Sequence, residues 1–211
     1  TFFLSLVRLI ALERRCVTIH ADLAPDRRIH ATGGQARGLY AEAVRHMATR
    51  TKADGGALAS VVERFISECV KEAETRGETV EQAIHTRLGE IQDLVGGHDF
   101  AQVLKCYWRG SEAGDDALKA AALRWLRAEY PTKTEARQAL GVRSIIDDAD
   151  VYDSLKLLAK FVRLAGYAGL VVVFDEMVNI YKLQSAQGRK QNFEQIVRIV
   201  NDMLQGDSEG L

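Results

Sequence analysis

The sequence predicts a protein of the α/β class that is mostly helical by residue count and has short parallel strands. Three observations support this prediction. There are only two prolines in 211 residues, and the helix formers Ala, Leu, Arg and Glu are abundant. Apolar residues recur at helical spacing through most of the chain. One short run, residues 170–174, is apolar at every position and mostly β-branched, which is typical of a strand in a parallel sheet.

The overall composition is that of an ordinary globular protein. Hydrophobic residues make up 47% and charged residues 27%, and no apolar run approaches the roughly 18 residues that a membrane span needs. The 28 basic and 29 acidic residues give a net charge of -1, so no overall field attracts nucleic acid or anionic lipid. Three widely spaced cysteines without a CxxC pair agree with a reducing compartment. We therefore expect a cytoplasmic protein without membrane contact, and any DNA contact must be local.

Residues 1–34 predict one helix followed by one strand. The β-rich stretch 16–21 follows the helix and ends at a polar loop. The helix is expected over residues 1–15 because four apolar residues lie at helical spacing. They are Phe3, Leu6, Val7 and Ile10.

Residues 35–165 predict a series of helices, which we interpret as a helical insertion or subdomain. Thr79 and Gln82 form a capping-box signal, and Thr132 starts a short helix that Gly141 ends. Apolar residues spaced by three and four positions predict the longer helices. These lie near residues 35–47, 58–69, 84–95, 118–125 and 151–162.

Residues 166–211 predict a strand, a polar loop over 184–190 and a last helix. The apolar run 170–174 has neither helical nor alternating spacing, so we expect a strand buried on both faces. It ends on two adjacent carboxylates, Asp175 and Glu176. Placing two charges there is costly unless they have partners or a function. Open α/β sheets bind their ligands at this carboxyl end of the strands.

The strand and its two carboxylates resemble the Walker B segment of P-loop ATPases. In that segment the Asp holds Mg²⁺, often through water, and the Glu activates the water that attacks ATP. Asn179 lies three residues after Glu176 and is expected to face the same site. The alternative is a strand end at which Asp175 caps the next helix while Glu176 is solvated in its first turn.

The start of the chain fits the same resemblance. A Walker A loop ends in Gly-Lys-Thr or Gly-Lys-Ser, and an apolar helix and a strand follow it. Thr1 precedes such a helix and strand, so Thr1 would be the hydroxyl ligand of Mg²⁺. The glycines and the phosphate-binding lysine would then lie before Thr1. The other interpretation is that Thr1 is an arbitrary starting point.

Together, these segments resemble the ATP-binding P-loop domain family associated with BREX (bacteriophage exclusion) loci, which is related to the AAA+ and STAND ATPases. Both ends of the chain carry the resemblance, and the helical middle carries it loosely. The matching segments are residues 167–183 and 192–206, together with residues 21–30 followed by 36–40.

This resemblance implies an Mg²⁺-dependent ATPase in a multicomponent phage-defence system, with ATP and Mg²⁺ as cofactors. Its partners would be other defence proteins or further copies of itself. Glu176 would be the catalytic carboxylate, Thr1 and Asp175 would bind the metal, and Asn179 would join them around the nucleotide. The strand at 16–21 would lie beside the strand at 170–174. Because the phosphate loop and a sensor strand are missing, we expect this chain to be an inactive fragment that binds nucleotide weakly or not at all.

Two other classes of function are weighed against the ATPase. One is a non-enzymatic helical adaptor or protein-interaction domain without nucleotide chemistry, in which Asp175 only caps a helix. The other is a DNA-facing patch, because arginines outnumber acids in the first fifty residues. We interpret these arginines as a solvated surface, since no aromatic residues are interleaved with them. They are Arg14, Arg15, Arg27, Arg28, Arg37, Arg45 and Arg50.

Overall fold

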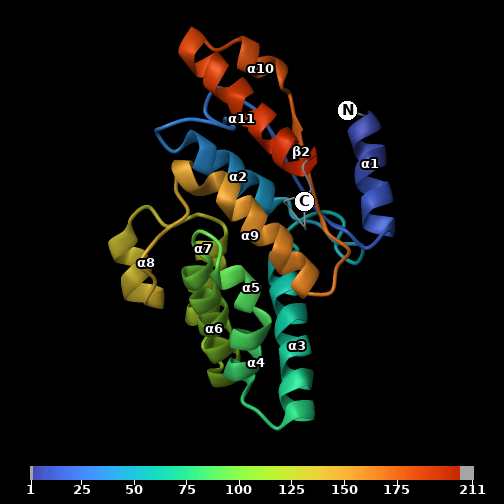
Figure 1. Ribbon diagram of the computed structural model, residues 1–211, viewed down its shortest axis with the longest axis vertical. Helices are drawn as coiled ribbons and strands as arrows, with labels where there is room; N and C mark the ends of the chain where they lie inside the picture. Colours follow the sequence, from blue (N-terminus) through green and yellow to red (C-terminus); the bar gives the residue numbers. More distant parts are fainter. Residues whose placement is uncertain (1, 205–211) are drawn as a thin grey trace.

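The computed structural model describes residues 2–204, which form two parallel strands and a helical body (Figure 1). The mostly helical α/β class predicted from the sequence is confirmed. The chain begins with α1 (Phe2–Glu13) and β1 (Val17–Asp22), and it ends with β2 (Leu170–Asp175), the short α10 (Val178–Tyr181) and α11 (Ala186–Leu204).

The helical body connects the two strands. The capping box of Thr79 with Gln82 is present at the start of α4, and the Thr132 side chain accepts the N–H of Glu135 at the start of α8. Figure 1 shows α2 and α9 between the lower helices and the strand region. The elements are α2 (Gln35–Arg45), α3 (Leu58–Arg76), α4 (Val80–Arg87), α5 (Gly89–Gln92), α6 (Gly97–Ala113), α7 (Asp116–Leu126), α8 (Lys133–Leu140), the 3-10 turn η1 (Asp148–Asp150) and α9 (Val151–Leu164).

β1 and β2 are parallel neighbours, which confirms the predicted adjacency. The register pairs Val17 with Leu170 and Asp22 with Asp175. Just beyond the paired residues, the N–H of Leu23 donates to the carbonyl of Asp175 at 3.0 Å. Both strands therefore end together, and their last residues lie at the same end of the sheet.

β2 is half-buried, which corrects the expectation of a strand buried on both faces. Leu170 is buried, whereas residues 171–175 have intermediate exposure. In the described part of the chain, β2 has β1 as its strand neighbour on one side and none on the other. An apolar hollow of about 360 Å³ lies along β2, with Phe174 and Val200 among its lining residues. The open edge explains why an apolar strand remains partly accessible.

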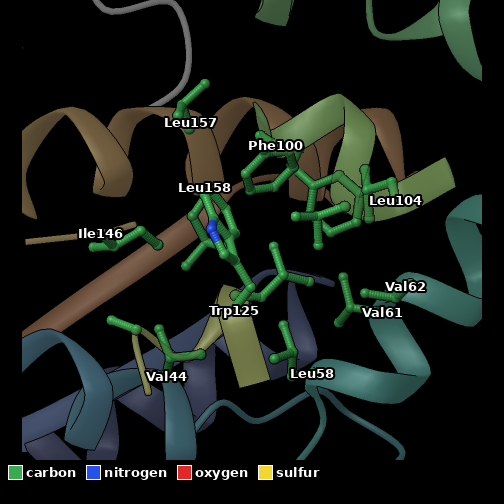
Figure 2. Close-up of a cluster of buried hydrophobic side chains, with 14 of the residues drawn as sticks. Val44, Leu58, Val61, Val62, Phe100, Leu104, Trp125, Ile146, Leu157 and Leu158 are labelled. Atoms are coloured by element: carbon green, nitrogen blue, oxygen red, sulfur yellow. The ribbon is translucent and has the colours of Figure 1, made fainter. Parts of the chain in front are cut away.

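The core is one apolar cluster that joins the strands to the helical body. Phe161 of α9 contacts the rings of Phe65 and Phe100 at centroid distances of 5.2 and 5.3 Å. Phe100 of α6 meets Trp125 of α7 edge-on at 6.4 Å. Figure 2 shows Phe100 and Trp125 together with Leu158 in this cluster. Because the cluster continues from β1 to α10, the region predicted as an insertion shares its core with the strands, and its boundaries stay a prediction.

The helices around residue 90 differ from the sequence prediction. The run predicted as one helix over 84–95 breaks at Leu88, where the backbone leaves helical geometry between α4 and α5. α6 has no counterpart among the predicted helices. Its first residue, Gly97, packs so closely on the carbonyl of Ile91 that a Cβ would collide with it. This close approach turns the chain sharply and lets α5 and α6 pack together.

The last helix also begins earlier than expected. The predicted polar loop over 184–190 is wrong from residue 186 onward, because α11 starts at Ala186. The side chain of Ser185 accepts the N–H of Gly188, which satisfies one of the first amides of the helix. A local capping bond therefore outweighs the low helix propensity of glycine.

A single carboxylate connects η1 to the start of α2 within the helical body. Asp148 of η1 accepts the N–H groups of Gly33, Gly34 and Arg37 at 2.7, 2.6 and 2.8 Å. Gly34 has a φ of 85°, which is natural for glycine, and α2 has no side-chain cap of its own. Asp148 thus satisfies amides that a helix start otherwise leaves unpaired.

Among the helices of residues 2–204, none combines the length and the apolar character that crossing a membrane requires.

Replacing Asp148 by alanine should lower the free energy of unfolding by about 2 kcal/mol, because three amides lose a charged acceptor. Urea denaturation measures this change. Asp150→Ala is the matched control, since Asp150 makes no side-chain cap bond, and it should change stability by less than about 0.5 kcal/mol. Equal effects of the two substitutions would contradict the role of Asp148.

Candidate functional site

Two aspartates lie side by side at the carboxyl ends of β1 and β2. Asp22 and Asp175 are register partners on strands that run about 4.8 Å apart, so their side chains leave the same face of the sheet. Asp22 is exposed and Asp175 is partly exposed. The sequence predicts Asp175 but not Asp22 as a site residue. The available signal for Asp22 is its position directly after the predicted strand.

The carboxylate of Asp175 is stabilised in its ionised form. Its Oδ1 accepts the N–H of Glu176 at 2.8 Å, and this hydrogen bond holds the pKa of Asp175 below its ordinary value. Asp175 is therefore negatively charged at neutral pH. The following helix, α10, begins after Met177 without a side-chain cap bond, so Asp175 does not act as its cap.

Glu176 has an unusual backbone conformation. Its φ is 58°, in the left-handed region that residues with a Cβ adopt at a cost of about 1–2 kcal/mol. The residue is exposed and directly follows the strand. A strained residue at the end of a strand, next to another carboxylate, is the kind of feature that clusters at functional sites.

Asn179 fastens the turn after β2 to the loop after β1. Its Nδ2 donates to the carbonyl of Leu23 at 2.7 Å, and its N–H donates to the carbonyl of Glu176 at 2.9 Å. The structure brings Asn179 to the same end of the sheet as Asp175. Because its amide is engaged by Leu23, its geometry suits a positioning role.

The amino end of α1 points to the same end of the molecule. Figure 1 shows the start of α1 at the height of the turn from β2 to α10. The amino end of a helix carries a partial positive charge and favours anionic ligands. Thr1, the other predicted metal ligand, lies outside the described residues.

The donor set at the end of the sheet suits a hard cation such as Mg²⁺. Asp22, Asp175 and Glu176 offer carboxylate oxygens, which are the ligands that Mg²⁺ prefers. Within residues 2–204 there is no group of three or more His, Cys, Asp or Glu residues arranged to hold a metal ion. Mg²⁺ is commonly held by one or two carboxylates together with water and substrate phosphates. The residues present therefore fit a cation that binds together with a nucleotide.

Parallel strands that end in carboxylates, beside the amino end of a helix, resemble the place at which open α/β proteins generally bind their ligands. The family model described as BREX system ATP-binding protein BrxC/D matches residues 1–211. The chain belongs to this family of ATP-binding proteins, so the resemblance noted in the sequence is confirmed. Comparisons with curated proteins and with solved structures found no match.

Glu176→Gly should raise the free energy of unfolding by about 1 kcal/mol, because glycine adopts a φ of 58° without the penalty of a Cβ. Glu176→Ala removes the same carboxylate but keeps the Cβ, so its stability should remain near that of the original chain. Urea denaturation of both variants measures the difference. If alanine stabilises as much as glycine, the backbone of Glu176 is not strained.

Proposed function

We propose that the carboxyl ends of β1 and β2 form the metal- and water-handling part of an ATP-hydrolysis site. The observation that carries the proposal is the register that puts Asp22 beside Asp175, next to the strained Glu176. Membership of an ATP-binding family supports the choice of nucleotide.

The proposed roles follow from the chemistry of each side chain. Asp175 and Asp22 would hold the Mg²⁺ that accompanies ATP, and Thr1 would supply a hydroxyl ligand. Glu176 accepts a proton from the attacking water. The bond from water oxygen to the γ-phosphorus forms while the bond between the γ-phosphorus and the bridging oxygen breaks, which gives ADP and phosphate. Asn179 holds the two loops that carry these groups.

The phosphate contacts need groups beyond these carboxylates. The 211 residues contain no Gly-Lys-Thr or Gly-Lys-Ser, so a Walker A loop is not among them. The partial positive charge at the start of α1 contributes to phosphate binding in this proposal. The carboxylates alone would repel ATP, and for this reason they act through the cation.

Hydrolysis is proposed to switch the conformation of a cytoplasmic phage-defence assembly whose other members are BREX components or copies of this chain. Membership of a BREX family supports the existence of such components. A row of exposed apolar residues on α1 also supports contact with another protein. Its members are Phe2, Phe3, Leu6, Leu9 and Ile10.

Glu176→Gln in the full-length gene product should reduce steady-state ATP turnover by about a hundredfold or more, because glutamine cannot accept the proton from water. The affinity for ATP should stay within about twofold, since Thr1, Asp22 and Asp175, to which the proposal assigns the metal, remain. Phosphate release and equilibrium nucleotide binding measure the two quantities.

Glu194→Gln is the matched control, because Glu194 is an exposed partner of Lys190 on α11. Its turnover should match that of the original protein. Unchanged turnover in Glu176→Gln would contradict the assignment of Glu176. If the original protein binds a BREX component but hydrolyses no ATP, the non-enzymatic adaptor becomes the better interpretation.

A further inference from the structure

Three arginines surround a small cavity at the amino ends of β1 and β2. The cavity has a volume of about 170 Å³. Because the strands are parallel, the cavity lies at the opposite end of the strands from Asp22 and Asp175. For strands of six residues the separation is about 20 Å. The side chains that matter for its chemistry are Arg15, Arg50, Arg64, Thr49, Thr51 and Tyr167.

Two of the guanidinium groups converge on one carbonyl oxygen. Nη2 of Arg64 donates to the carbonyl of Gly166 at 3.3 Å, and Nη2 of Arg15 reaches the same oxygen at 3.5 Å. The guanidinium of Arg64 also lies over the ring of Tyr167, 4.6 Å from its centroid. One neutral oxygen therefore sits between two positive charges.

The fold fixes the backbone around this cluster. Arg15 has a φ of 62°, its N–H donates to Leu12, and its carbonyl accepts the N–H of Ala168. On the other side, Thr49 is buried and its hydroxyl lies 3.3 Å from that of Thr51. Arg15 and Arg64 thus lie where α1, α3 and the two strands meet, and Arg50 lies in the turn between Thr49 and Lys52.

No carboxylate among residues 2–204 forms an ion pair with the cluster, although Glu68, one turn further along α3, interacts electrostatically with Arg64. Arg15, Arg50 and Arg64 form no ion pair there, whereas other arginines of the chain pair with glutamates. Glu63, next to Arg64 in the sequence, instead accepts the hydroxyl of Tyr107 at 3.1 Å. Neighbouring cations that lack an ion-pair partner repel one another, and a bound anion reduces that repulsion. The planar guanidinium matches phosphate oxygens in particular.

We propose that this cluster binds a phosphate group of a nucleic-acid backbone. A cavity of this size accepts one phosphate, and Arg15, Arg50 and Arg64 are exposed, so a polymer can reach them. Arg14 and Lys52 are exposed and adjoin the cluster in sequence. The hydroxyls of Thr49 and Thr51 add donors of the kind that contact phosphates. The site goes beyond the proposed ATP chemistry, because it lies at the other end of the strands.

The structure changes the interpretation of two of the arginines in the first fifty residues. Arg15 and Arg50 belong to the arginines that the sequence suggests are simply solvated, and Arg64 does not belong to that group. The fold brings these three together although they come from different elements. A local cluster of this kind binds a polyanion even though the net charge of the chain is -1.

The test measures the affinity of the 211-residue chain for a short fluorescent DNA duplex at several salt concentrations. In Arg15→Gln/Arg64→Gln the affinity at low salt should fall about tenfold, and the slope of log affinity against log salt should fall by about two. Lys133→Gln/Arg137→Gln removes two positive charges from α8 and is the matched control. Lys133 and Arg137 are exposed, and α8 lies away from α1 in Figure 1, so the control should bind as the original chain does.

Arg50→Gln keeps the test decisive if the double variant fails to fold. Within residues 2–204 the Arg50 side chain makes no hydrogen bond or ion pair, so its replacement should leave the fold intact. This variant should melt like the original chain and lower the salt slope by about one. Equal losses in the control and cluster variants, or no duplex binding at low salt, would overturn the proposal. Calorimetric binding of inorganic pyrophosphate that needs the arginines, without duplex binding, would assign the cavity to a free anion and overturn the nucleic-acid assignment.

Discussion

β1 and β2 pair in parallel although the entire helical body lies between them in the sequence. Parallel strands cannot be joined by a tight turn, so the connection has to leave one end of the sheet and return to the other. The entropy lost in closing a long connection grows only slowly with its length. Helices α2 to α9 offset this loss because their apolar faces share one core with Val17, Ile19 and Ala21 of β1.

The register of this pairing determines which charged side chains lie together at each end of the sheet. A slip of one residue would move Asp175 to the opposite face and separate it from Asp22. Burial of Ile19 and Leu170 on the face toward the helical body favours the observed register. The carboxyl end then presents negative charge, and the amino end presents the guanidinium groups of Arg15 and Arg64. One strand pair thus carries negative charge at one end and positive charge at the other.

Local signals in the sequence predict much of this fold. Helical spacing predicts α1, α3 and α9, and the capping residues Thr79 and Thr132 predict two helix starts. The apolar run before Asp175 predicts β2, and the family resemblance places it beside β1. These predictions are correct because each depends on spacing or capping within a few residues.

The features that the sequence does not predict depend on distant contacts. The close approach of Gly97 to Ile91 explains the break before α6, and the open edge of β2 explains its partial exposure. Asp22 becomes a site residue through its register with Asp175, and Arg64 joins Arg15 through the carbonyl of Gly166. The left-handed backbone of Glu176 also has no local sequence signal, since glutamate rarely adopts it.

Metal-directed cleavage of the full-length gene product tests most directly whether the paired strand ends form a single site for metal-bound ATP. Ferrous iron replaces Mg²⁺ beside ATP, and ascorbate with peroxide then cuts the backbone near the bound metal. Mass spectrometry of the fragments should find ATP-dependent cuts at two places far apart in the sequence, next to Asp22 and next to Asp175. Cuts that occur elsewhere, or that do not depend on ATP, would show that the paired aspartates do not face the nucleotide metal.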